Sequence, residues 1–107
     1  MIKNLPIAEA VNLAGLVAYQ EGQVVSRTLA QDSGTSVTLF AFPTGEGLST
    51  HTTPADAVVY VLDGEARVEI DGNSSVVKAG ETIVMPANVP HAVVAEQDFK
   101  MLLIVVQ

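Results

Sequence analysis

The chain has 107 residues, of which 49% are hydrophobic and 5% aromatic, and a net charge of −7. This length predicts one domain with an aliphatic core, and the absence of cysteine excludes disulfides and thiolate metal sites. The five basic residues are scattered along an acidic chain, which a phosphate backbone would repel, so we expect no nucleic-acid partner.

Residues 1–22 are expected to form an N-terminal arm. Within them, residues 7–17 could form a short helix or an extended arm that ends at Gly15, and their periodicity does not choose between the two. Glu9 and Asn12 interrupt the apolar run, so we expect neither a signal peptide nor a membrane span. We therefore expect a cytoplasmic protein without a membrane partner. An apolar arm of this kind often packs on a neighbouring chain.

The sequence pattern of residues 23–107 predicts a series of short strands. Runs rich in Val, Ile, Thr and Leu alternate with turns that contain glycine. The predicted strands cover residues 23–29, 36–42, 57–62, 66–70, 75–77, 82–85, 91–95 and 99–106. The pairs Asp63-Gly64 and Asp71-Gly72 each favour a hairpin turn between two strands. Many short strands at close spacing predict an all-β sandwich or small barrel.

Two stretches resemble the sequence motifs of the single-domain bacterial cupins. The first family motif is G-x5-H-x-H-x3,4-E-x6-G, and the second is G-x5-P-x-G-x2-H-x3-N. Their matching positions here are Gly45, His51 and Gly64 for the first motif and Gly80, Pro86 and His91 for the second. The resemblance covers residues 23–107 and implies an RmlC-like cupin barrel, a double-stranded β-helix of the jelly-roll type. It also implies a homodimer, which the small size and the apolar arm fit.

Four positions depart from the family pattern. Thr53 stands in place of the second motif histidine, and Ala57 in place of the glutamate. Ala95 replaces the final asparagine, and Asn88 replaces a glycine in a turn that asparagine can also adopt, because it tolerates left-handed backbone. Of the four residues that hold a metal in the family, His51 and His91 remain.

Two imidazoles are half of the donor set that this family gives to a divalent transition metal such as Zn, Fe, Mn or Ni. Zinc sites and iron oxygenases in proteins use at least three protein ligands. Asp56 could replace the missing carboxylate only if Pro54 distorts the strand, because alternation turns Asp56 outward when Ala57 faces inward. The same alternation places Tyr60 on the outside.

The sequence therefore leaves three functions open. The first is a protein that binds a small molecule in the barrel mouth, with weak or no metal binding. The second is a metal-dependent enzyme, an oxygenase, isomerase or lyase, in which water or substrate completes the coordination of His51 and His91. The third is a non-catalytic partner or structural protein. The residues predicted to line the pocket with the two histidines are Thr53, Ala57, Val59, Met85 and Ala95.

Overall fold

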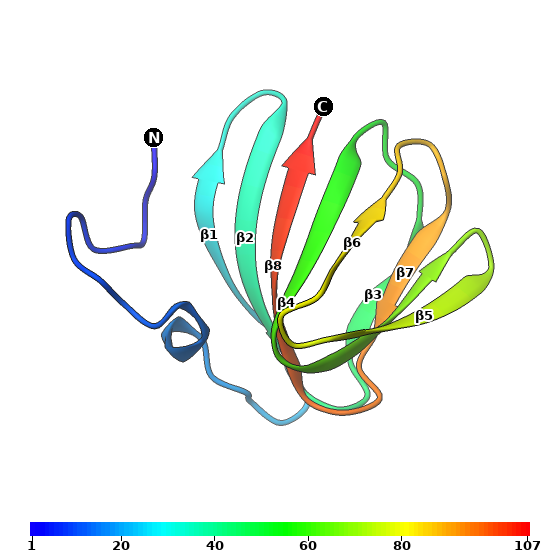
Figure 1. Ribbon diagram of the computed structural model, residues 1–107, viewed down its shortest axis with the longest axis horizontal. Coiled ribbons are helices and arrows are strands. Elements are labelled where there is room, and N and C mark those ends of the chain that lie inside the picture. Colours follow the sequence, from blue (N-terminus) through cyan, green and yellow to red (C-terminus); the bar gives the residue numbers. More distant parts are fainter.

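The chain folds into one curled antiparallel sheet preceded by an extended arm (Figure 1). The computed structural model describes residues 1–107. The strands are β1 (Val25–Gln31), β2 (Thr35–Phe42), β3 (Gly47–His51), β4 (Asp56–Ile70), β5 (Asn73–Lys78), β6 (Thr82–Met85), β7 (His91–Val94) and β8 (Phe99–Val106). The predicted all-β class is confirmed, and the curled sheet fits the predicted jelly-roll barrel.

β4 joins the two walls of the barrel. The strand order is β1-β2-β8-β4-β7-β3, and β5 and β6 also pair with β4. The first half of β4 pairs with β8 and β6, and its second half pairs with β7 and β5. We call β1, β2, β8, β6 and the first half of β4 the large wall, and β3, β7, β5 and the second half of β4 the small wall. The two walls curl toward each other around the core (Figure 1).

Asp63 and Gly64 do not form the predicted hairpin turn. β4 continues through both residues, and its register with β8 shifts between Val61 and Asp63. Gly64 has a φ of +69°, and a β-carbon there would lie 2.2 Å from the carbonyl oxygen of Asp98. The pair is therefore an irregularity at which β4 bends from one wall into the other. The prediction was wrong because the left-handed backbone conformation occurs in β-bulges as well as in hairpin turns.

Asp71 and Gly72 form the second predicted hairpin, which is confirmed. They join β4 to β5, and their φ angles are +51° and +80°. Positive φ at both central residues is the geometry whose twist matches that of the flanking strands. The pairing of Ile70 with Asn73 across the turn sets the register of the whole β4–β5 ladder.

The start of β1 and the presence of β3 differ from the prediction. β1 begins at Val25, because residues 20–23 form a turn in which the Gln23 amide donates to the Gln20 carbonyl at 3.1 Å. β3 was not predicted, since it carries only one aliphatic side chain, that of Leu48. Its pairing with β7 makes it a strand, and at Gly47 a β-carbon would lie 2.2 Å from the carbonyl oxygen of Val93.

The core has two parts. The main cluster of 12 buried residues fills the space between the walls and includes Phe42, Val59, Val68 and Phe99, all 0% exposed. The stacked rings of Phe42 and Phe99, with centroids 4.9 Å apart, close the end of the barrel away from the histidines. A second cluster lies on the outer face of the large wall, beneath the arm.

The arm packs on its own chain. It contains a single 3-10 helix, η1 (Leu13–Leu16), whose preceding residue Asn12 accepts a hydrogen bond from the Gly15 amide through its side chain. Apolar side chains of the arm, including Leu5 and Val17, cover Leu29 and Leu39 of the large wall. No helix in the structure is long and apolar enough to cross a membrane.

Tyr19 fastens the arm to the bend in β4. Its hydroxyl donates to a carboxylate oxygen of Asp63 at 2.5 Å, and the Lys100 ammonium lies 5.1 Å from its ring centroid. Lys100 also donates to the Ala14 carbonyl at 2.7 Å. Burial, followed by the hydrogen bond and the charge of Asp63, raises the pKa of Tyr19 well above its ordinary value. The contact therefore favours the protonated phenol.

Tyr19→Phe should lower the free energy of unfolding at pH 8 by about 1 kcal/mol, because the phenylalanine ring keeps the packing and loses one hydrogen bond. A raised pKa means that the phenol contributes its full stability below the unfolded value of about 10 and loses it as the pH rises further. Urea unfolding of both proteins at pH 8 and pH 11 measures this. A difference between them that is the same at both pH values would contradict the assignment.

Candidate functional site

His51 and His91 lie side by side at one end of the barrel. His51 ends β3, His91 begins β7, and the two residues are partners in the β3–β7 ladder. Their ring centroids are 4.5 Å apart with an interplanar angle of 69°, an edge-to-face arrangement. His91 is 2% exposed, whereas His51 is exposed. The fold thus brings together the two motif histidines, which are far apart in the chain.

Both imidazoles are oriented by the backbone. Nδ1 of His51 lies 2.7 Å from the Ser49 carbonyl oxygen, and Nδ1 of His91 lies 2.9 Å from the Val89 carbonyl oxygen. A carbonyl oxygen can only accept a hydrogen bond, so each Nδ1 carries a proton and donates. In a neutral imidazole that donates through Nδ1, the Nε2 atom keeps its lone pair for a ligand. The rings are held in place before any ligand arrives.

Thr53 lies in the loop between β3 and β4, beside the turn of the second motif. Its hydroxyl donates to the Ala55 carbonyl at 3.2 Å, and its carbonyl accepts from the Asn88 amide at 2.7 Å. Asn88 has a φ of +64°, so the predicted left-handed asparagine in place of glycine is confirmed. The contact between Thr53 and Asn88 ties the two motifs together next to the histidines.

The wall opposite the histidines is apolar. Inward positions of the small wall form the row His51–His91–Ile70, and those of the large wall form the row Val105–Ala57–Met85. Short connections, residues 52–55 and 86–90, join these rows, so both lie at the same end of the barrel. We call this end, with Thr53, the histidine end. Its partly exposed side chains include Ile70, Val105 and Thr53.

The other predicted pocket residues lie deeper or elsewhere. Val59 follows Ala57 on the inward face of β4, one step further into the barrel, and is 0% exposed. Ala95 follows the far end of β7, where its carbonyl accepts from the Gly45 amide at 2.8 Å. It therefore lies at the opposite end from His91. Ala57, Val59, Met85 and Ala95 all belong to the packed main core.

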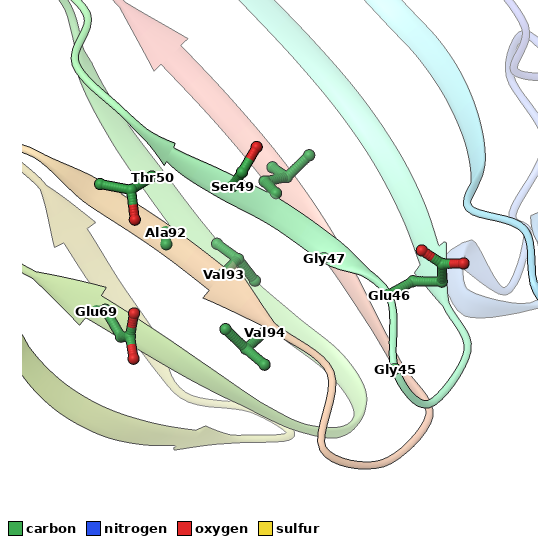
Figure 2. A pocket seen from close by; sticks show the side chains of 10 residues that line it. Gly45, Glu46, Gly47, Ser49, Thr50, Glu69, Ala92, Val93 and Val94 are labelled. Carbon is green, nitrogen blue, oxygen red and sulfur yellow. The ribbon is translucent and has the colours of Figure 1, made fainter.

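Surface hollows adjoin the small wall on its outer side. A shallow groove of about 410 Å³ is lined by side chains of β3, β7 and β4, among them Thr50, Glu69 and Val94 (Figure 2). A smaller hollow of about 120 Å³ shares Thr50 and Glu69 with this groove and includes His91. Neither Thr50 nor Glu69 was predicted from the sequence to line a hollow. Alternation along β3 would have separated Thr50 from His51, but β3 itself was not predicted.

The donor set does not fit a resident metal. No group of three or more His, Cys, Asp or Glu residues is arranged to hold a metal ion. Asp56 is exposed, and its carboxylate accepts a hydrogen bond from the Ala87 amide at 2.8 Å. The predicted alternation is confirmed, since Ala57 is 4% exposed and Tyr60 is 39% exposed. Pro54 therefore does not turn Asp56 toward the histidines.

Comparison with known proteins identifies the family. The protein-family model of the cupin domain matches residues 38–107 of this chain. A conserved protein of unknown function from Streptococcus pyogenes is 40% identical, with a TM-score of 0.96 over 99% of this chain and 93% of that chain. A cupin superfamily protein from Desulfitobacterium hafniense is 33% identical, with a TM-score of 0.94 over 99% of this chain and 97% of that chain.

A cupin 2 conserved barrel domain protein from Leptotrichia buccalis is 50% identical, with a TM-score of 0.88. That match covers 91% of this chain and 47% of the other, which is therefore about twice as long. None of the curated proteins compared matches the chain. The domain match and two similar structures that cover nearly the whole chain show that this protein belongs to the cupin family, as a small RmlC-like barrel.

Proposed function

We propose that the histidine end of the barrel binds a small organic molecule, with weak or no metal binding. The observation that carries this proposal is the pair of imidazoles, 4.5 Å apart and each tied through Nδ1 to a backbone carbonyl. Two fixed Nε2 acceptors favour a ligand that presents O–H or N–H donors to them. Fold alone assigns no activity, so the proposal depends on this geometry.

The apolar wall favours a ligand with a hydrophobic body. Ile70 and Val105 are partly exposed next to the histidines, whereas Ala57 and Met85 are buried behind them. The ligand would therefore contact the rim of the barrel, because the main core behind it is packed. The proposed ligand is small, with one polar end on the imidazoles and an apolar part on the valine and isoleucine side chains. We also propose a cytoplasmic location, which the absence of cysteine supports.

A ligand screen by thermal shift tests the proposal. Small hydroxylated or N–H-bearing ring compounds, in large excess over their dissociation constants, should raise the melting temperature, because a ligand at 100 times its Kd stabilises a protein by about 2.7 kcal/mol. His51→Ala should then weaken the binding of any hit at least tenfold. This ring is exposed, so its loss should leave the fold intact.

Val76→Ala is the control, because Val76 is exposed on β5 of the small wall and lines none of the hollows. This variant should bind the hit like the wild-type protein. A hit whose affinity is unchanged in both His51→Ala and His91→Ala would place the binding site elsewhere and refute the proposal.

A metal-dependent cupin enzyme is the second candidate. It is favoured by the free Nε2 atoms, since metal-bound histidines usually donate their other nitrogen to a carbonyl or carboxylate, as both rings do here. Water or substrate would have to supply the remaining ligands of a divalent transition metal. Metal content after purification without a histidine tag distinguishes the candidates. Stoichiometric metal that is lost in His51→Ala would favour the enzyme, whereas metal that dialyses away would favour the first proposal.

A further inference from the structure

The dipeptide Asp-Gly occurs twice in the chain, once in a turn and once within a strand. Asp71 and Gly72 form the tip of the β4–β5 hairpin, whereas Asp63 and Gly64 lie at the bend in β4. The two glycines have similar φ angles, +80° and +69°. The fold thus places the same pair of residues in two different surroundings.

The polar groups at the hairpin tip are unrestrained. Asp71 and Gly72 are exposed, as are the four residues that follow them. The Asp71 carboxylate accepts no hydrogen bond within the chain, and the Gly72 amide donates none. No atom lies within 4 Å of the position that a β-carbon on Gly72 would take. A turn with so few contacts opens locally at low cost, so its main chain is free to rotate.

The same groups are held in place at the bend in β4. The Asp63 carboxylate accepts a hydrogen bond from the Tyr19 hydroxyl, and β4 pairs with β8 at both Asp63 and Gly64. The Gly64 carbonyl accepts from the Ala79 amide at 3.1 Å. A β-carbon on Gly64 would lie 2.2 Å from the Asp98 carbonyl oxygen, so the two backbones pack directly against each other. Rotation of the main chain here would separate β4 from β8.

An aspartate that precedes glycine is open to attack by the glycine nitrogen, because no β-carbon shields that nitrogen. The Gly72 nitrogen would form a bond to Cγ of Asp71, and the hydroxyl group of the protonated carboxyl would leave with the amide proton as water. The product is a five-membered succinimide ring.

Water then opens this ring at one of its two carbonyl carbons. Cleavage of the bond between the nitrogen and Cγ restores aspartate. Cleavage of the bond between the nitrogen and the main-chain carbonyl carbon of Asp71 leaves isoaspartate, in which the peptide bond runs through Cγ. One water leaves and one is added, so the mass of the chain does not change and no oxidant or reductant takes part.

The hairpin tip contacts the histidine end of the barrel. The Asp71 amide donates a hydrogen bond to the Pro90 carbonyl at 2.8 Å, and Ile70 pairs with His91. Gly72 and His91 also line the same hollow of about 120 Å³. Isoaspartate lengthens the main chain of the turn by one methylene group. Because a two-residue turn fixes the register of the strands that it joins, this addition should break the contact with Pro90.

We propose that Asp71-Gly72 is a site of spontaneous aspartate isomerisation, and that the product releases the hairpin tip from Pro90 beside His91. The inference rests on the contrast between the free groups at the tip and the restrained groups of Asp63-Gly64. Water is the only co-reactant. This proposal is independent of any ligand at the histidine end.

Prolonged incubation of the full chain in mildly acidic buffer, followed by tryptic peptide mapping, tests the proposal. The buffer is acidic because a protonated carboxyl loses its hydroxyl group more readily than a carboxylate does. Trypsin releases residues 68–78, in which Asp71 is the only aspartate, and residues 28–67, which contain Asp63. Electron-transfer fragmentation distinguishes isoaspartate from aspartate at each position. In the folded protein, isoaspartate should form at Asp71 at least tenfold faster than at Asp63.

Two controls separate the effect of the fold from that of the local sequence. In urea that unfolds the chain, the two rates should become similar, because the two pairs differ in restraint only in the folded state. Asp71→Glu keeps the carboxylate but would have to close a six-membered ring, so residues 68–78 of this variant should stay unmodified. Deamidation of Asn73 would change the mass of that peptide and is thereby distinguished.

Nuclear magnetic resonance reports the effect on the histidine end, since the chain has only two histidines. The isomerised protein should show a second set of imidazole signals for His91, and incubated Asp71→Glu should not. Equal rates at Asp71 and Asp63 in the folded protein, a rate difference that persists undiminished in urea, or unchanged His91 signals in the isomerised protein would each overturn the proposal.

Discussion

Gly64→Ala should destabilise the protein by more than 3 kcal/mol, which is large for a single methyl group. The left-handed backbone at φ +69° costs an alanine about 1–2 kcal/mol. In addition, the new β-carbon would lie 2.2 Å from the Asp98 carbonyl oxygen, a backbone atom that can retreat only if β4 and β8 separate. At about 4–8 °C per kcal/mol for a domain of this size, the melting temperature should fall by more than about 12 °C.

Variants at two other glycines measure the cost of the left-handed backbone and the cost of the close contact separately. Gly72 has a φ of +80° and no atom within 4 Å of an added β-carbon, so Gly72→Ala carries the backbone cost alone. Gly47 has no positive φ, but a β-carbon there would meet the Val93 carbonyl at 2.2 Å, so Gly47→Ala carries the contact alone. Urea unfolding of the three variants should rank Gly64→Ala as the least stable. Equal losses in Gly64→Ala and Gly72→Ala would show that the bend in β4 does not depend on the close contact.

Restoring the two missing family ligands should create a metal site. The double variant Thr53→His/Ala57→Glu adds an imidazole in the loop after His51 and a carboxylate on the inward face of β4. Two added donors beside the existing imidazoles provide the four-ligand set that a first-row metal prefers. We expect stoichiometric Zn²⁺ or Ni²⁺, bound at least 100-fold more tightly than by the wild-type protein. Isothermal titration calorimetry and elemental analysis measure both.

The matched control moves the carboxylate to the other face of the same strand. Thr53→His/Asp56→Glu contains the same added imidazole, but its longer carboxylate begins from an outward position, where Asp56 contacts the Ala87 amide. This control should bind metal no better than Thr53→His alone. If the control and the Thr53→His/Ala57→Glu variant bind metal equally, the inward face of β4 is not part of the site. A folded Thr53→His/Ala57→Glu variant without metal would mean that the histidine end cannot gather four ligands.

Predictions from the local sequence were correct where a single physical cause determines the conformation of a residue. Alternation along β4 was enough to place Tyr60 outside and Ala57 inside, because a strand has only two faces. Asn88 was assigned to left-handed backbone because its short side chain tolerates that conformation. Asp63-Gly64 failed because the same dihedral angles occur in a turn and in a bulge. Only the ladder between β4 and β8 distinguishes the two.

The amino-acid sequence by itself determined the all-β class, most of the strands and the identity of the two remaining histidines, since alternation, turn residues and motif spacing are local properties. The tertiary structure alone decided that β3 is a strand, that Ala95 lies at the opposite end from His91, and that the arm covers part of the outer face of the large wall. These features depend on which strands pair and which faces meet. That is settled by burial and by hydrogen bonds between segments far apart in the chain, which no local pattern records.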